Sequence, residues 1–163
     1  MKRVLLICWI ACISAVASAQ DFASRFMAEH NRDTNLTCIS ISPKMMREIM
    51  KADIEKDDGI LDIISNLKSM QMLTSQVKGR KYYKEALDIL ERNSNRFEPF
   101  LSLEDDGENY RIMVRKKEKK IIELVMLANE KNDFVVVNFT GKMDDGFINK
   151  LADSMKIKEP LNN

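Results

Sequence analysis

The sequence has 163 residues, with 26 basic and 25 acidic side chains, one histidine and three cysteines. This length suits a single domain that buries its own apolar core. The near balance of charge argues against a nucleic-acid-binding protein, which carries a basic excess on one face. Because His30 is the only histidine, a metal site built from several histidines is excluded. We predict that His30 lies on the surface.

The start of the chain has the three parts of a cleavable secretory signal peptide. Residues 2–3 are basic, residues 4–16 carry no charge, and residues 17–19 have the small-x-small pattern of a cleavage site. We therefore predict cleavage between Ala19 and Gln20.

A transmembrane anchor and a lipid anchor are the alternatives to cleavage. The uncharged run has about 13 residues, whereas a spanning helix needs about 20, so we expect no transmembrane span after cleavage. A lipid anchor at Cys12 is not expected, because Trp9 does not suit the enzyme that attaches lipid. Residues 1–19 are thus predicted to be a signal peptide, and residues 20–163 a single domain.

Cleavage would change the chemistry of the remaining chain. It removes Cys8, Cys12 and the only tryptophan, so that Cys38 is the one thiol left and no intramolecular disulfide can form. Cys38 falls within an apolar strand, which predicts a buried and unreactive thiol. The alternative is an intermolecular disulfide or a redox role.

The first half of the domain alternates predicted helices and strands. A helix over residues 21–30 and a strand over 36–41 come first, and Ser42 and Pro43 then have the N-cap and first-turn positions of a second helix. Hydrophobic spacing predicts a short helix over 60–67, a strand around Met70 and Met72, and a helix over 78–93. Because helices separate the first two strands, these strands could pair in parallel.

The second half is predicted to be rich in strands. Alternating or continuous apolar runs predict strands over 97–103, 110–115, 121–128 and 134–139, with Pro99 placing the first of them at an edge. Asp144 is a predicted cap for a last helix that buries Phe147, Ile148, Leu151 and Met155. The basic run 115–120 is read as a solvated hairpin turn, with a patch for anionic lipid or polysaccharide as the alternative.

These elements predict an α+β fold in two layers. The sheet would be mostly antiparallel, with about six strands and a C-terminal four-strand meander, and the helices would pack on one face. The other face would carry Thr37, Arg111, Met113 and Arg115, a mixed surface that could receive a partner.

Several segments together resemble a known family. They are Ile39–Met46, Thr74-Ser75, Phe100–Glu108, Lys120–Leu127 and Phe134–Met143. In this order they resemble the domain-of-unknown-function 4252 family, small exported proteins of Bacteroidetes-type bacteria. The resemblance implies a periplasmic or outer-envelope location in a Gram-negative bacterium. It implies no activity and no functional residue.

The residues themselves give no sign of catalytic chemistry. No nucleophile–base pair, metal cluster or phosphate-binding glycine loop is visible, so we predict no catalytic, cofactor-binding or metal-binding residues and no cofactor. Asp57-Asp58 and Asp105-Asp106 fit turns better than a calcium loop. The methionines fit core filling, although thioether sulfur could also bind Cu(I).

The sequence thus favours a non-enzymatic envelope protein that binds or regulates a protein partner, without nucleic acid. The alternative is a periplasmic hydrolase or small-ligand-binding protein that uses carboxylates, because catalytic carboxylates need no local motif.

Overall fold

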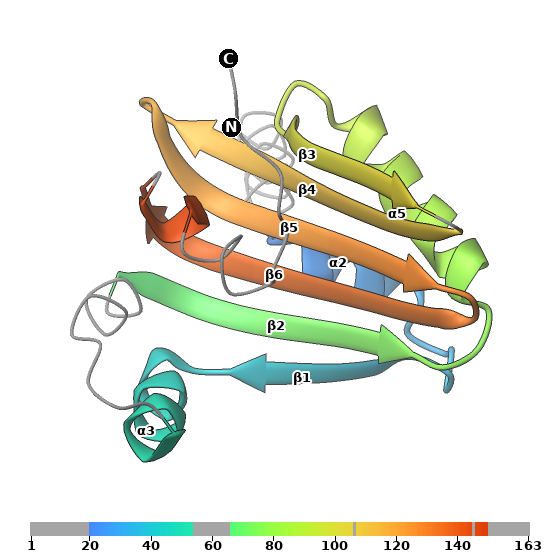
Figure 1. Cartoon of the computed structure of the whole chain (residues 1–163), viewed down its shortest axis with the longest axis horizontal. Helices are drawn as coiled ribbons and strands as arrows, with labels where there is room; N and C mark the ends of the chain where they lie inside the picture. The colour runs from blue at the N-terminus through green and yellow to red at the C-terminus, as the bar shows by residue number, and fades with distance from the viewer. Residues whose placement is uncertain (1–19, 54–65, 106, 145, 150–163) are drawn as a thin grey trace, which may run out of the picture.

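The computed structural model describes residues 20–53, 66–105, 107–144 and 146–149. Six strands of this part form one antiparallel sheet in the order β1-β2-β6-β5-β4-β3 (Figure 1). The strands are β1 (Thr37–Ile41), β2 (Leu67–Ser75), β3 (Glu98–Asp105), β4 (Glu108–Lys117), β5 (Lys120–Glu130) and β6 (Asp133–Met143). The predicted α+β class is confirmed, and β3 to β6 form the predicted meander.

Among the described residues, three longer helices accompany the sheet: α2 (Phe22–Glu29), α3 (Pro43–Asp53) and α5 (Gly79–Arg92). Helices α2 and α5 lie behind the sheet in Figure 1 and cover one of its faces. Helix α3 lies beside the end of β1, and its Met46 packs with the apolar cluster of the opposite face. The prediction of helices on a single face therefore describes α2 and α5 but not α3.

Side-chain caps begin three helices, at Ser42 and Asp144 as the sequence predicted and also at Asp21. The Asp21 carboxylate accepts a hydrogen bond from the Ser24 N–H at 2.8 Å, and the Ser42 hydroxyl accepts one from the Met45 N–H at 3.2 Å. The Asp144 carboxylate accepts one from the Phe147 N–H at 2.9 Å. Such caps satisfy N–H groups that the first helical turn leaves free.

Some predicted features fall outside the described residues. Leu151 and Met155 of the predicted last helix are among these, and so are residues 60–65 of the predicted short helix. Leu67, which that prediction included, belongs to strand β2.

The possible parallel pairing of the first two strands is wrong. Strands β1 and β2 are antiparallel, with Thr37 opposite Thr74 and Ile41 opposite Met70. The chain leaves β1 into α3 and re-enters the sheet at Leu67, near the end where β1 finishes. A helix between two strands permits a parallel crossover but does not require one, because the chain can also return at the same end.

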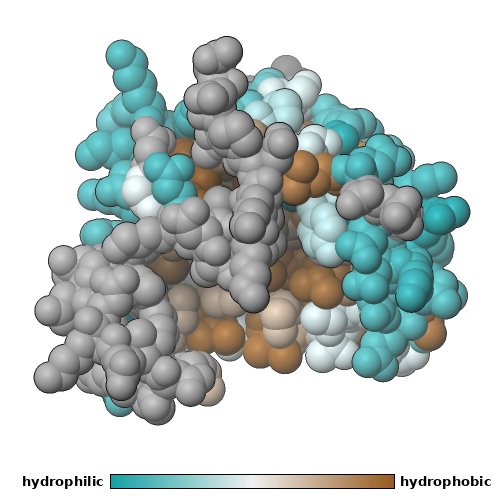
Figure 2. All heavy atoms as spheres, viewed as in Figure 1, coloured by the Kyte–Doolittle hydropathy of each residue, from teal (hydrophilic) through white to brown (hydrophobic). Residues whose placement is uncertain are grey.

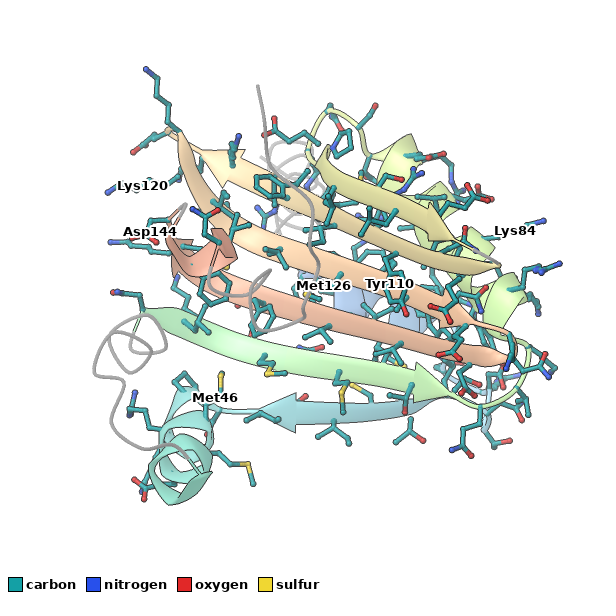
Figure 3. The ribbon with its side chains drawn as sticks, in the orientation of Figure 1. Met46, Lys84, Tyr110, Lys120, Met126 and Asp144 are labelled. Atoms are coloured by element: carbon teal, nitrogen blue, oxygen red, sulfur yellow. The ribbon has the colours of Figure 1, made fainter. Side chains whose placement is uncertain are left out.

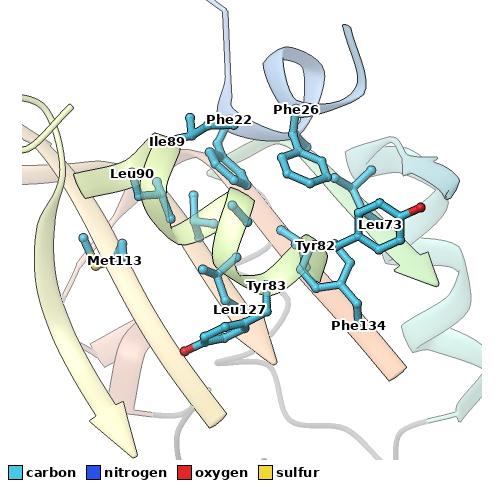
Figure 4. Packing of buried hydrophobic residues seen from close by; sticks show 14 of the residues in the cluster. Phe22, Phe26, Leu73, Tyr82, Tyr83, Ile89, Leu90, Met113, Leu127 and Phe134 are labelled. Atoms are coloured by element: carbon cyan, nitrogen blue, oxygen red, sulfur yellow. The ribbon is translucent and has the colours of Figure 1, made fainter. Parts of the chain in front are cut away.

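The main core lies between the sheet and the pair α2 and α5 (Figure 4). Phe134 of β6 is the meeting point, because its ring centroid lies 5.8 Å from both Phe26 of α2 and Tyr82 of α5. Leu73 and Leu90 are fully buried in the same cluster. Each such side chain contributes about 1.5–3 kcal/mol through burial, so this cluster is a major source of stability.

In the described part of the chain, no helix is both long and apolar enough to cross a membrane.

Candidate functional site

The sheet face opposite α2 and α5 carries apolar side chains from one edge to the other. Alternate residues of a strand share a face, and the register aligns them across the strands. A central row takes one residue from each strand: Leu101, Ile112, Met126, Val137, Met72 and Ile39. An outer row follows: Leu103, Tyr110, Ala128, Val135, Thr74 and Thr37. We call these two rows the open surface. Within it Ile112 is buried, Ile39 and Thr37 are exposed, and the other side chains are half-buried.

A third row on the same face is covered. Its members are Val114, Leu124, Phe139, Met70 and Ile41. Phe147 stands edge-on to Phe139 with ring centroids 5.5 Å apart, and Ile148 and Met46 are buried in the same cluster. Among the described residues, helical cover on this face therefore lies over the third row.

The open surface is hollowed near its centre. An apolar cavity of about 130 Å³ lies between the two rows, with Tyr110, Met126, Ala128 and Val137 among its lining residues. These four side chains are half-buried. Figure 3 labels Tyr110 and Met126 on neighbouring strands, and Figure 2 shows hydrophobic residues gathered over the middle of this face with hydrophilic residues at its ends. Exposed apolar area of this kind marks interaction sites in many proteins.

Carboxylates border the open surface at the end of the meander. Glu108 lies opposite Glu130, and Glu130 lies opposite Asp133, so that neighbouring strands place like charges side by side. We call these three residues the carboxylate row. Like charges in directly opposed positions destabilise a sheet. The row therefore costs the fold some stability. It is not among the features predicted from the sequence.

One member of the row is tied to the open surface. The Tyr110 hydroxyl donates a hydrogen bond to the Glu108 carboxylate at 3.1 Å. Burial, and then the Glu108 carboxylate, raise the pKa of Tyr110 above its usual range. Tyr110 therefore stays protonated at neutral pH and holds Glu108 beside the apolar cavity.

The partner surface predicted from the sequence is wrong in most of its members. Arg111 lies 3.3 Å from Glu91 of α5, Arg115 pairs with the buried Glu123, and Met113 is buried in the main core. All three lie on the helix-covered face, and Thr37 alone lies on the open surface. Both faces of β4 are apolar near its middle, so alternation along this strand could not show which face the helices cover.

Cys38 is exposed, which corrects the prediction of a buried thiol. It lies opposite Leu73, on the helix-covered side, but β1 is the edge strand and the described helices do not bury it. Desolvation raises the pKa of its thiol, which lowers the thiolate fraction at neutral pH.

The sequence predicted that His30 lies on the surface, but its side chain instead joins α2 to α5. Its Nδ1 lies 2.8 Å from the Phe26 carbonyl oxygen, and its Nε2 lies 3.0 Å from the Glu85 carboxylate. The Tyr82 hydroxyl beside it donates to Asp33 at 2.5 Å. This bond and the N–H of Asn35 hold the pKa of Asp33 at about 2, while burial and Asp33 raise the pKa of Tyr82 to about 12. These hydrogen bonds join α2, α5 and the loop that follows α2, which indicates a structural role.

Glu123 is a buried charge within the strand that a nearly continuous apolar run predicts over residues 121–128. It is 0% exposed, and Arg115 Nη2 lies 2.7 Å from its carboxylate. The carboxylate also accepts the Phe22 N–H at 2.7 Å, and the Asn138 amide oxygen accepts the Ala23 N–H at 3.0 Å. Glu123 and Asn138 thus cap the first turn of α2, where the helix dipole favours negative charge. A lone charge within an apolar run is the sequence signal that could have revealed it.

The remaining candidates from the sequence are the metal ligands, the methionines and the basic run. In the described residues, no three His, Cys, Asp or Glu side chains are grouped so as to hold a metal ion. Met46 and Met70 pack in the apolar cluster of the third row, in keeping with core filling, whereas Met45 is exposed and does not fill the core. The basic run forms the β4–β5 turn, where Glu118 and Lys119 have positive φ. Use of that turn for an anionic ligand stays a prediction.

Within the described residues, fold and site define an α+β domain whose sheet has one face covered by α2 and α5 and one apolar face on which helical residues cover the third row. Residues 29–151 match the family described as "Domain of unknown function (DUF4252)". The chain belongs to this family, which confirms the resemblance seen in the sequence. A comparison with curated proteins finds no match.

Proposed function

We propose that the chain is a non-enzymatic, exported envelope protein that binds a protein partner through the open surface. The partner would be a segment with one apolar face, flanked by lysine or arginine at one end. The observation that supports this proposal is the position of the carboxylate row next to the open surface. The fold gains nothing from opposed like charges, whereas a cationic partner would relieve their repulsion.

The composition of the open surface suits such a partner. Met72 and Met126 lie in its central row, and methionine side chains adapt their shape to the groups they contact. Tyr110, which is common in interaction surfaces for its apolar ring and polar end, sits between the cavity and Glu108. An apolar side chain of the partner would enter the cavity, and its cationic end would lie against the carboxylates.

Binding can be measured with two synthetic amphipathic peptides. One carries leucine on one face with lysines at one end, and the other has glutamate in place of lysine. We expect the lysine peptide to bind more tightly and to lose affinity as salt is added. The double variant Glu108→Gln with Glu130→Gln should weaken its binding several-fold, and Met72→Gln should weaken it through the apolar contact.

The matched control is the double variant Glu29→Gln with Glu118→Gln. Both glutamates are exposed and lie away from the open surface, so this variant should bind like the unchanged protein. The proposal is wrong if the two peptides bind equally, or if the control variant loses as much affinity. It is also wrong if the chain binds neither peptide and binds vesicles of anionic lipid instead.

The proposal of export depends on the first 19 residues and is tested by a separate experiment. The full-length chain is expressed in a Gram-negative host, and the mass of the intact product is measured. A chain that begins at Gln20 is expected. A product that keeps its first residues, or one that carries lipid on Cys12, would contradict the cleavage proposed here.

A further inference from the structure

The two edges of the sheet differ in how they are protected from pairing with another strand. The β3 edge carries Pro99, which has no N–H to donate, and a register shift between Pro99 and Leu101. Exposed acidic side chains, Glu98 and Glu104, lie along it. Proline, irregular pairing and charge are the features that protect edge strands.

The β1 edge has none of these features. Its five residues, Thr37–Ile41, contain no charge, proline or glycine, and the first four of them are exposed. Within the described part of the chain, no strand pairs with the outer side of β1. The N–H and C=O groups on that side can therefore pair with another strand.

Two strongly exposed apolar side chains lie at the same edge. Three large hydrophobic residues of the described chain are strongly exposed: Ile39, Met45 and Val77. Ile39 belongs to β1, and Met45 lies in the first turn of α3, directly after β1. Ile39 is also the last member of the central row, so the open surface reaches the sheet edge at this residue.

We propose that β1 pairs in antiparallel fashion with β1 of a second copy of this chain, about a two-fold axis at Ile39. In this register, the side chains of β1 are compatible with those of a second β1. Ile39 lies opposite Ile39 of the second copy, Cys38 opposite Ser40, and Thr37 opposite Ile41. Every pair is uncharged, and the two open surfaces become continuous across the new contact. A symmetric contact of this kind closes on itself and gives a dimer.

Cysteine cross-linking tests the register directly. In the Cys38→Ser background, Ile39→Cys places each new thiol opposite its own copy. Directly opposed Cα atoms lie about 4.5–5.5 Å apart, within the range of a disulfide. The matched variant, Thr37→Cys in the same background, places the two thiols four residue steps apart, or about 13 Å. We expect a disulfide-linked dimer from the first variant and none from the second.

A second measurement does not depend on engineered thiols. Light scattering on the full chain should give twice the mass of one copy, and Ile39→Lys should reduce this to one copy with an unchanged circular dichroism spectrum. Val77→Lys is the matched control, because Val77 and Ile39 are both 44% exposed. This control should leave the mass of the dimer unchanged.

The proposal is overturned if the unchanged protein has the mass of one copy at all concentrations. It is also overturned if both cysteine variants cross-link equally, since that result indicates random collision. A strand of another protein at this edge would give a larger complex in which Ile39→Cys forms no symmetric dimer. These results do not bear on the carboxylate row, so each proposal can fail while the other stands.

Discussion

At the scale of single residues, the buried Glu123 decides how α2 is held. Replacing it with alanine leaves the Phe22 N–H without its acceptor and Arg115 without its partner. Removing one member of a buried ion pair costs about 3 kcal/mol or more. We therefore expect Glu123→Ala to lower the free energy of unfolding by about that amount in urea titrations.

Two further variants separate charge from hydrogen bonding at this position. Glu123→Gln keeps an acceptor for the Phe22 N–H and should cost less than the alanine variant. Glu118→Ala removes an exposed glutamate from a turn and should change stability by no more than about 0.5 kcal/mol. Equal stability of all three variants would show that Glu123 does not hold α2.

Tyr82 and Asp33 give the fold a defined response to pH. The folded pKa of Asp33 is lowered to about 2, so its contribution is present above its unfolded value and is lost as the pH falls toward 2. The folded pKa of Tyr82 is raised to about 12, so its contribution is present below pH 10 and is lost as the pH rises toward 12.

The variant Tyr82→Phe removes the hydroxyl that links these two groups. We expect its melting temperature to fall by a few degrees at neutral pH. The loss should shrink both below pH 4 and above pH 10, where the native pair is itself weakened. Thermal unfolding of both proteins across this range is the measurement. A constant difference at every pH would contradict the assigned hydrogen bond.

At the scale of elements, the start of α5 depends on close contact with the β5–β6 turn. The Gly79 N–H donates to the Asn132 carbonyl oxygen at 2.8 Å. A Cβ atom at Gly79 would lie only 2.4 Å from that oxygen. Gly79→Ala must therefore push the helix from the turn, and overpacking of this kind costs about 1–3 kcal/mol.

Gly146 provides the matched control for this substitution. A Cβ there would come no closer than 3.3 Å to a side-chain oxygen of Asp144. That contact requires the flexible Asp144 side chain to shift by only a few tenths of an ångström, so Gly146→Ala should cost clearly less than Gly79→Ala. Urea titrations of the two variants test the difference. Similar losses from both would show that backbone freedom, and not contact with Asn132, explains the need for glycine.

At the scale of the whole molecule, local patterns predicted the elements well, but not the sheet face that each residue occupies. The caps at Ser42 and Asp144 and the four strands of the meander follow from local chemistry. Both faces of the sheet are apolar at the centre, so the sequence pattern predicts the wrong face for Arg111 and Arg115. Their long apolar stems lie on the helix-covered side while their charges reach Glu91 and Glu123.

The carboxylate row illustrates a second limit of local reasoning. Glu108, Glu130 and Asp133 flank two separate turns, and each turn alone has an ordinary acidic composition. The meander brings both turns to one end of the sheet, so the row exists only once the strands are paired. Applying that topology to the predicted strands could have revealed it.

The extent of the family match leads to a last prediction. The match begins at residue 29, yet α2 lies almost entirely before it and supplies Phe22 and Phe26 to the core. Each buried phenylalanine contributes about 1.5–3 kcal/mol, against a net stability of about 5–15 kcal/mol for a whole domain. A chain that begins at residue 29 should therefore lose cooperative unfolding and bind a hydrophobic dye, whereas a chain that begins at residue 20 should do neither.

The full-length variant with Phe22→Ala and Phe26→Ala separates packing from chain length, and it should also be strongly destabilised. If the shorter chain unfolds cooperatively at the same temperature as the longer one, α2 is an accessory to this fold and not part of its core.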